Sequence, residues 1–210
     1  MSEGGGTETT TPFARATVVV LAKAPILGTV KTRLAGTIGA HEVLILYRRL
    51  LARTVAGVRD PRWDTVLAVS PDETACDDAL WPPLPRRMAQ GTGDLGARML
   101  RPLARAANDA PVLVVGSDIP GLSARQIAAA FRALEVAPFV FGPALDGGFY
   151  LVGAREAPPG TLFDGVEWSA PTTLRSVVGN LPPGRHATIE TLDDLDDEAA
   201  LERHRAAGTL

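Results

Sequence analysis

Cysteine and histidine are scarce in this chain of 210 residues. Cys76 is the only cysteine, so no disulfide can form within the chain, and a lone reduced thiol fits the cytoplasm. The histidines, His41, His186 and His204, stand far apart and lack the spacing of a zinc site. No Gly-x-Ser-x-Gly segment occurs, which leaves serine hydrolase chemistry without support.

The chain also lacks an excess of charge of either sign. Its 21 basic and 24 acidic side chains give a net charge of −3, which does not support a nucleic-acid scaffold or a polybasic membrane binder. No apolar run approaches the length of a membrane span. The start of the chain is rich in Gly, Thr and Glu and has no basic region of a signal peptide. We therefore expect a cytoplasmic protein that binds neither nucleic acid nor membrane, with a disordered tail over residues 1–14.

Short apolar runs alternate with stretches of helical periodicity through the rest of the chain. Strands are predicted over 17–22, 64–70, 112–115, 139–141, 149–152 and 186–190, and helices over 40–58, 94–107, 123–134, 170–178 and 196–205. This alternation is typical of a mostly parallel sheet with helices on both faces. The length and the 46 % hydrophobic content fit one domain, which we place at residues 15–210. Ligands of such sheets bind beyond the carboxyl ends of the strands.

A cationic loop follows the first predicted strand. Lys23, Lys31 and Arg33 lie within it, and Pro25 and Gly28 stand between them. Glycine and proline permit a loop whose backbone approaches a ligand closely, and the cations can bind phosphate oxygens. It is not a Walker A loop, because Val30 stands where that motif needs glycine. The alternative is an exposed basic turn, but the position after a buried strand favours phosphate binding.

Two carboxylates stand in short segments that follow strands. Asp118 comes after the strand at 112–115, and a carboxylate at a strand end suits Mg²⁺ or Mn²⁺. An Asx turn ahead of Pro120 explains it equally well. Asp146 lies in a glycine-rich turn, where it could bind an acceptor hydroxyl, act as a base or approach the metal. An ordinary Asp-Gly hairpin turn is again an equal alternative.

Three further segments carry weaker signals. Glycines at 91, 93 and 96 match the spacing of a dinucleotide fingerprint, but no strong strand precedes them and no acidic ribose partner is evident. Free backbone N–H groups before the helix at 94 still favour an anion. The acidic run 193–198 is typical of a solvated helix start, although it could supply a second metal ligand. Trp168 and Ser169 are candidates for a flexible flap, for which core packing of the tryptophan is the commoner alternative.

Taken together, these segments resemble the DUF2064 group of glycosyltransferase-like proteins, some of which are linked to arsenosugar biosynthesis. The motifs, in order, are Lys-Ala-Pro-x-x-Gly-x-Val-Lys-Thr-Arg-Leu at 23–34, Gly-Asp-Leu-Gly-x-Arg-Met at 93–99, Gly-Ser-Asp-x-Pro at 116–120, Gly-Pro-Ala-x-Asp-Gly-Gly-Phe-Tyr-Leu-Val-Gly at 142–153 and Val-x-Trp-Ser at 166–169. The resemblance covers residues 16–202 and places the chain in the nucleotide-diphospho-sugar transferase superfamily. It implies the Rossmann-like GT-A fold, an α/β/α arrangement of three layers around a mostly parallel sheet.

The resemblance also implies a set of site residues. The nucleotide and its phosphates would be bound by Lys23, Pro25, Gly28, Lys31, Arg33, Gly93, Asp94 and Ser117. The pocket for the acceptor would be formed by Gly147, Gly148, Tyr150, Trp168 and Ser169. Asp118 and Asp146 would be catalytic, and Asp118 and Asp196 would hold Mg²⁺ or Mn²⁺. The chain departs from the family's Asp-x-Asp-Thr-Pro-Glu-Asp ending at 197–199, so the second ligand stays open between Asp146 and the acidic run 193–197.

Three functions follow from this interpretation. The first is metal-dependent glycosyl transfer from a nucleotide-activated sugar to a small acceptor. The second is nucleotidyl transfer, resembling guanylyltransferases, in which a nucleotide-activated small molecule forms and pyrophosphate is released. The third is a nucleotide-binding module without catalysis. The sequence leaves open the nucleobase, the sugar, the acceptor and the oligomeric state, a homodimer included.

Overall fold

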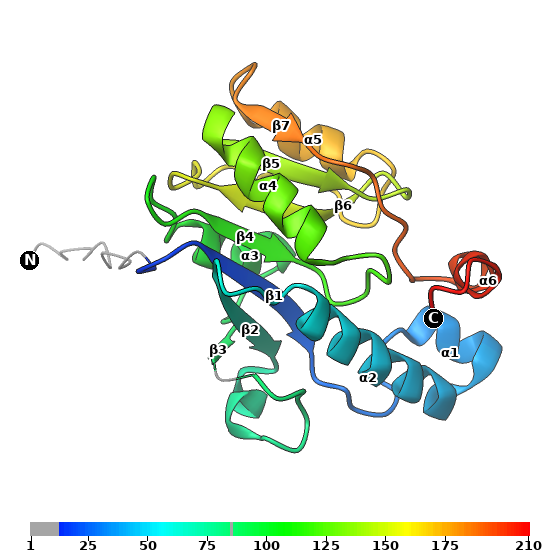
Figure 1. The fold of residues 1–210 in the computed structure, drawn as a ribbon. Helices are drawn as coiled ribbons and strands as arrows, with labels where there is room; N and C mark the ends of the chain where they lie inside the picture. The colour runs from blue at the N-terminus through cyan, green and yellow to red at the C-terminus, as the bar shows by residue number, and fades with distance from the viewer. Residues whose placement is uncertain (1–12, 85) are drawn as a thin grey trace, which may run out of the picture.

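In the computed structural model, which describes residues 13–84 and 86–210, seven strands form one central sheet (Figure 1). They are β1 (Thr17–Lys23), β2 (Asp64–Ser70), β3 (Arg87–Ala89), β4 (Val112–Val115), β5 (Phe139–Pro143), β6 (Phe149–Ala154) and β7 (His186–Thr188). Their order across the sheet is β3-β2-β1-β4-β6-β5-β7. Neighbouring strands are parallel except at the two pairings that β6 makes, with β4 and with β5. The predicted mostly parallel sheet is confirmed.

Helices cover both faces of the sheet and complete three layers. They are α1 (Thr32–Ile38), α2 (Ala40–Gly57), α3 (Leu95–Leu103), α4 (Ala124–Val136), α5 (Thr173–Gly179) and α6 (Glu198–Ala206), with a short 3₁₀ helix at Asp72–Cys76. Side chains of β1 alternate between the layers: Val18 and Val20 pack with α2 and α4, whereas Val19 packs with α3 and α5. Each face of the sheet therefore has its own apolar core. None of the described helices is long and apolar enough to cross a membrane.

Local chemistry explains where two helices begin. The Asp94 carboxylate accepts a hydrogen bond from Ala97 N at 2.8 Å, which caps α3. Ser123 caps α4 in a capping box with Gln126. α5 begins at Thr173 rather than at 170, because the preceding residues form a turn closed by the Thr173 hydroxyl, 2.7 Å from Ala170 O.

The boundary of the predicted tail needs a correction. Residues 1–12 lie outside the described residues. Phe13, which we assigned to the tail, is instead buried against the core that contains α3, and its ring lies 4.3 Å from the Arg105 guanidinium carbon. Phe13 therefore belongs to the folded domain, although it precedes β1 in the chain.

The reversed strand β6 matters for the site. Because β6 runs antiparallel to β4, its first residue lies at the same edge of the sheet as the last residues of β1 and β4. The β5–β6 turn, which contains Asp146, is therefore brought to the carboxyl edge where the cationic loop and Asp118 also lie. Three segments far apart in sequence meet at one edge.

Candidate functional site

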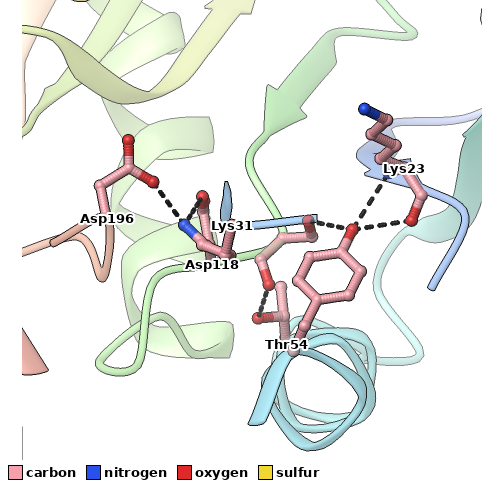
Figure 2. A network of polar contacts seen from close by, with 7 residues as sticks. Lys23, Lys31, Thr54, Asp118 and Asp196 are labelled. Carbon is pink, nitrogen blue, oxygen red and sulfur yellow. Dashed lines mark hydrogen bonds and ion pairs between the residues drawn. The ribbon is translucent and has the colours of Figure 1, made fainter. Parts of the chain in front are cut away.

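A lysine ammonium lies between two carboxylates at this edge (Figure 2). Lys31 Nζ donates to Asp118 Oδ2 and to Asp196 Oδ1, at 2.5 Å in each case. The lysine precedes α1, Asp118 follows β4, and Asp196 lies just before α6. The lysine side chain is only 7 % exposed, against 30 % for Asp118 and 49 % for Asp196. The structure thus brings the cationic loop, the strand-end carboxylate and the acidic run together.

The backbone at Lys31 is unusual. Its φ of 46° and ψ of 46° are left-handed, and it is the N-cap of α1 without a side-chain capping bond. A non-glycine residue in this region costs roughly 1–2 kcal/mol, so surrounding contacts must hold it there. Burial on its own would lower the pKa of Lys31, but the charges of Asp118 and Asp196 outweigh it and raise the pKa above its ordinary value. The ammonium therefore stays charged.

Two further carboxylates, those of Asp146 and Asp194, lie near Asp118 and Asp196. Burial, and then the charges of Asp146, Asp118 and Asp196, raise the pKa of Asp194 to about 6. Asp146 Oδ1 accepts a hydrogen bond from Gly148 N at 2.8 Å, so it does form the turn that was one of its two interpretations. The same side chain lines the cleft described below, so the turn bond does not remove Asp146 from the site.

The raised pKa of Asp194 has a consequence for stability. Its ordinary pKa is 3.8, so between about pH 4 and pH 6 the folded chain holds more protons than the unfolded chain. The free energy of unfolding should fall as the pH rises through this window. Asp194→Asn should therefore be more stable than the unchanged protein at pH 7.5 by about 1 kcal/mol, a value reduced for the partial exposure of the carboxylate.

Urea unfolding in EDTA at pH 4 and at pH 7.5 would measure this difference. We expect the gain from Asp194→Asn to disappear at pH 4. The exposed Asp109, in the turn between α3 and β4, supplies a matched control as Asp109→Asn. An equal gain at both pH values would show that the surrounding carboxylates do not destabilise the ionised form of Asp194.

The structure reveals a residue that the sequence did not single out. Tyr47 lies in the apolar stripe of α2, and its ring is buried. Its hydroxyl donates to Lys23 O at 2.8 Å and accepts from Lys23 N at 3.1 Å, which holds the start of the cationic loop. The only signal in the sequence is a phenol within an otherwise aliphatic stripe.

Some of the residues predicted to bind the nucleotide form hydrogen bonds within the protein. Ser117 is buried, its hydroxyl 3.4 Å from the Tyr47 hydroxyl, and its carbonyl accepts from Thr54 at 3.2 Å. The Asp94 carboxylate is occupied by its capping bond. Gly93 has a φ of 102°, and its carbonyl accepts from the Arg98 side chain at 3.0 Å. These contacts favour positioning roles for Ser117 and Asp94.

The residues of the cationic loop differ in where they lie. The Lys23 side chain is exposed and extends away from Lys31 in Figure 2. Gly28 has a φ of 76°, a conformation that glycine adopts without strain. The Pro25 carbonyl accepts from Arg48 at 3.4 Å. Arg33, on α1, lines a groove together with Asp146, Asp194 and Asp196. Lys31 and Arg33 are thus the cations of the loop that lie among the carboxylates.

A cleft of about 210 Å³ opens beside Asp118. Apolar side chains, three carboxylates and the turn after β5 contribute to its lining, which includes Leu21, Leu95, Met99, Phe149, Trp168, Asp118, Asp146, Asp194 and Gly148. Tyr150 and Ser169 also line it, although the Tyr150 hydroxyl is bonded to Glu190 O at 3.0 Å. Trp168 packs on Phe163 with ring centroids 5.8 Å apart, so it contacts the core and lines the cleft at once.

Two glycines near the cleft serve close packing. A Cβ on Gly96 would lie 2.7 Å from the Phe163 side chain and 3.2 Å from Trp168, so this glycine lets α3 approach the aromatic cluster. A Cβ on Gly147 would lie 2.2 Å from Pro171 O, and Gly147 is absent from the lining of the cleft. Its predicted place in the acceptor pocket is therefore a supporting one, in the turn that presents Asp146.

A comparison with family models decides the relationship. The model described as "Uncharacterized protein conserved in bacteria (DUF2064)" matches residues 54–170. The chain belongs to this family. The matched part of this DUF2064 protein contains Asp118, Asp146 and Trp168, whereas Lys31 and Asp196 lie outside it. No curated protein sequence matches the chain.

Solved structures resemble this DUF2064 protein over almost its whole length. A protein from Desulfovibrio desulfuricans G20, provisionally described as a nucleotide-diphospho-sugar transferase, has a TM-score of 0.75 and 24 % identity over 91 % of this chain and 95 % of its own. A 4-diphosphocytidyl-2C-methyl-D-erythritol synthase from Anaerococcus prevotii DSM 20548 has a TM-score of 0.56 and 11 % identity over 93 % and 97 %. CMP:2-keto-3-deoxy-manno-octonic acid synthetase complexed with CTP has 0.50 and 14 % over 93 % and 98 %. Structural similarity at identities this low shows the fold alone. The shared fold confirms the predicted GT-A-like architecture.

Proposed function

We propose that this DUF2064 protein is a transferase that binds a nucleotide-activated sugar at the carboxyl edge of the sheet and passes the glycosyl group to a small acceptor. The observation that carries the proposal is the position of Lys31 Nζ, 2.5 Å from the carboxylates of Asp118 and Asp196. Three segments contribute one charged group each, at the edge where α/β sheets bind their ligands. Ion pairs between a buried lysine and partly exposed carboxylates are weak evidence for stability, which favours a functional reason for this cluster.

The cationic loop is the proposed site of the nucleotide diphosphate. Lys31 and Arg33 lie among the carboxylates, where they can bind phosphate oxygens, and Lys23, Pro25 and Gly28 shape the start of the loop. The loop at Gly93, ahead of α3, is the proposed second boundary of the nucleotide site. For a phosphate to bind Lys31, the lysine ammonium must either move away from the two carboxylates or bind the phosphate and the carboxylates at the same time.

The donor set suits a divalent cation. Among residues 13–84 and 86–210, no three His, Cys, Asp or Glu side chains are placed to hold a metal. Two carboxylate oxygens nevertheless face the single point that Lys31 Nζ occupies. Mg²⁺ is usually bound through one or two carboxylates together with phosphates and water, so Asp118 and Asp196 fit it, and Mn²⁺ favours similar oxygen ligands. When bound, such an ion would neutralise phosphate charge and stabilise the departing diphosphate.

The residues of the chain have distinct parts in the proposed transfer. The bond between the anomeric carbon and the diphosphate oxygen breaks, and the acceptor oxygen bonds to that carbon. The electron pair leaves with the diphosphate, where Lys31 and Arg33 offset its charge. The acceptor's proton passes to a carboxylate, and Asp146 is the candidate because it lines both the cleft and the groove of Arg33.

Nucleotidyl transfer is the second candidate. The two synthases among the structural neighbours share the fold, with TM-scores of 0.56 and 0.50, and one of them was solved with CTP. In that reaction the attack falls on the α-phosphate and pyrophosphate leaves. Release of a nucleoside diphosphate from a sugar donor would select glycosyl transfer, and release of pyrophosphate from a nucleoside triphosphate would select the alternative.

A thermal-shift screen tests the shared part of both candidates. Nucleoside diphosphates, triphosphates and nucleotide sugars are each added with and without MnCl₂. A ligand that binds only the folded state raises the apparent melting temperature by mass action, so at least one nucleotide should stabilise the protein with Mn²⁺. If no nucleotide does so, the proposed function is wrong. Binding without turnover of any donor would support the non-catalytic module.

Lys31→Met should separate the binding of metal from the binding of nucleotide. The ammonium competes with a cation for Asp118 and Asp196, so its removal should tighten Mn²⁺ binding without nucleotide by about 10-fold. The loss of a phosphate ligand should weaken nucleotide binding by about 10- to 100-fold. Mn²⁺ titration followed by electron paramagnetic resonance, together with calorimetry for the nucleotide, would measure both.

Lys23→Met is the matched control, because it removes the same charge from an exposed side chain of the same loop. Lys23→Met should not change the affinity for Mn²⁺ in the absence of nucleotide. If Lys31→Met binds Mn²⁺ no better than Lys23→Met, Lys31 does not occupy the position of the metal.

A further inference from the structure

The cleft beside Asp118 has a lining that distinguishes among acceptors. The residues that line it in the described part of the chain include no lysine, arginine or histidine. Three aspartates, Asp118, Asp146 and Asp194, line it, and most of the other lining residues are apolar. An anion that entered the cleft would lose water and meet only carboxylates.

The cations near the cleft do not offset the negative charge of its lining. Lys31 is already shared between Asp118 and Asp196, and Arg33 lines the groove that also contains Asp196 rather than the cleft. The phosphates of a nucleotide donor would engage these two cations and any metal ion. Arg203, the other cation among the described residues that line this groove, is paired with Asp193 at 2.8 Å, so neither the cleft nor the groove offers a further positive charge to a second phosphate or carboxylate.

The apolar part of the lining includes a cluster of aromatic rings. Phe149 and Trp168 lie with ring centroids 6.4 Å apart and tilted by 59°, and Phe163 packs beside both rings. At the start of α3, Leu95 is 45 % exposed, which is high for a leucine that lines a cleft. Such a surface gains free energy when the flat or apolar face of a ligand covers it.

We propose that the acceptor bound in this cleft has an apolar face that packs on Phe149, Trp168 and Leu95, and carries a hydroxyl but neither phosphate nor carboxylate. This rests on the proposed function, since it assigns the second substrate of the same site. The hydroxyl reaches Asp146, which takes its proton in the transfer. The assignment opposes an acceptor that carries a phosphate or a carboxylate group.

Three probes of similar shape and different charge test the assignment in the metal-free protein. They are tyrosol, which is neutral, tyramine, which is a cation, and 4-hydroxyphenylacetate, which is an anion. The protein is labelled with 5-fluorotryptophan, and its three tryptophans give separate fluorine resonances, of which Trp168→Phe identifies one. Tyrosol and tyramine should shift the Trp168 resonance, and 4-hydroxyphenylacetate should bind at least about 10-fold more weakly because of the carboxylates.

A charge added at the edge of the cleft provides a second, independent test of the assignment. Leu95→Lys should strengthen the binding of 4-hydroxyphenylacetate and weaken that of tyramine, each by about 3- to 10-fold. Val136→Lys adds the same charge at the end of α4, beside the opposite edge of the sheet, and should change neither. Val136 is 84 % exposed, so the control should not disturb folding.

Two outcomes would overturn the proposal: equal binding of the anion and of tyrosol, or no shift of the Trp168 resonance by any probe. Both can be told apart from a failure of the proposed function, which is tested separately by the nucleotide and Mn²⁺ screen. If nucleotides bind and the charge preference is absent, only the acceptor assignment is wrong. If the preference is present and no nucleotide binds, the transferase proposal is wrong and its acceptor assignment is lost with it.

Discussion

Asp118→Asn is expected to lower the rate of transfer by roughly 100- to 1,000-fold while the protein remains folded. Asp118 supplies one of the two carboxylate oxygens that face the cation position, at 2.5 Å from Lys31 Nζ. Asparagine has the same shape but no negative charge, so it can no longer offset the charge of a cation there. Lys31 keeps Asp196 as its partner, which limits the cost to folding.

The measurement is turnover of whichever nucleotide donor the thermal-shift screen identifies, in Mn²⁺, beside thermal unfolding followed by circular dichroism. Asp109→Asn makes the same chemical change in an exposed turn between α3 and β4, and should retain full activity. Unchanged turnover in Asp118→Asn would remove Asp118 from the mechanism. A large drop in melting temperature would instead assign it a structural role.

Gly147→Ala should destabilise the protein by about 2–5 kcal/mol and disturb the position of Asp146. Gly147 has a φ of 89°, where a Cβ is strained, at a cost of roughly 1–2 kcal/mol. The added methyl group would lie 2.2 Å from Pro171 O and 2.6 Å from Pro171 Cα. Both contacts are with backbone, so the turn or the segment before α5 must shift, at a typical cost of 1–3 kcal/mol.

Urea unfolding would measure this loss, and Gly179→Ala provides the comparison. Gly179 is the last residue of α5, and a Cβ there would meet nothing within 4 Å. Its replacement should change the free energy of unfolding by less than about 1 kcal/mol, because alanine fits the same conformation. Equal unfolding midpoints for the two variants would show that the turn accommodates the methyl group without strain.

Much of the layered architecture could be predicted from the sequence, because each buried strand carries its own signal. The continuous apolar run at 17–22 and the β-branched run at 112–115 became β1 and β4, and the strand predicted at 64–70 has the bounds of β2. Strands buried on both faces need apolar side chains at every position, which makes them visible in a linear pattern. The capping residues Asp94 and Ser123 were equally visible, since a cap acts within one helical turn.

The elements that were missed are short or depend on distant contacts. β3 is three residues long, and it is a strand only because it pairs with β2. α1 has seven residues, and its N-cap is a lysine in a left-handed conformation, which no local preference of lysine predicts. The reversed direction of β6 also leaves no mark on its own sequence, because it is set by the hairpin with β5 and by pairing with β4.

By itself, the sequence determined the α/β class, the candidate cationic loop and the candidate carboxylates, because composition and local order carry that information. Only the tertiary structure decided that Lys31 would lie between Asp118 and Asp196, residues separated from it by 87 and 165 positions. It also decided that Ser117 would be used within the fold, while Asp194 would join the cleft. The physical reason is that electrostatic interactions depend on distance in space and on burial, and both are set by how the strands are ordered in the sheet.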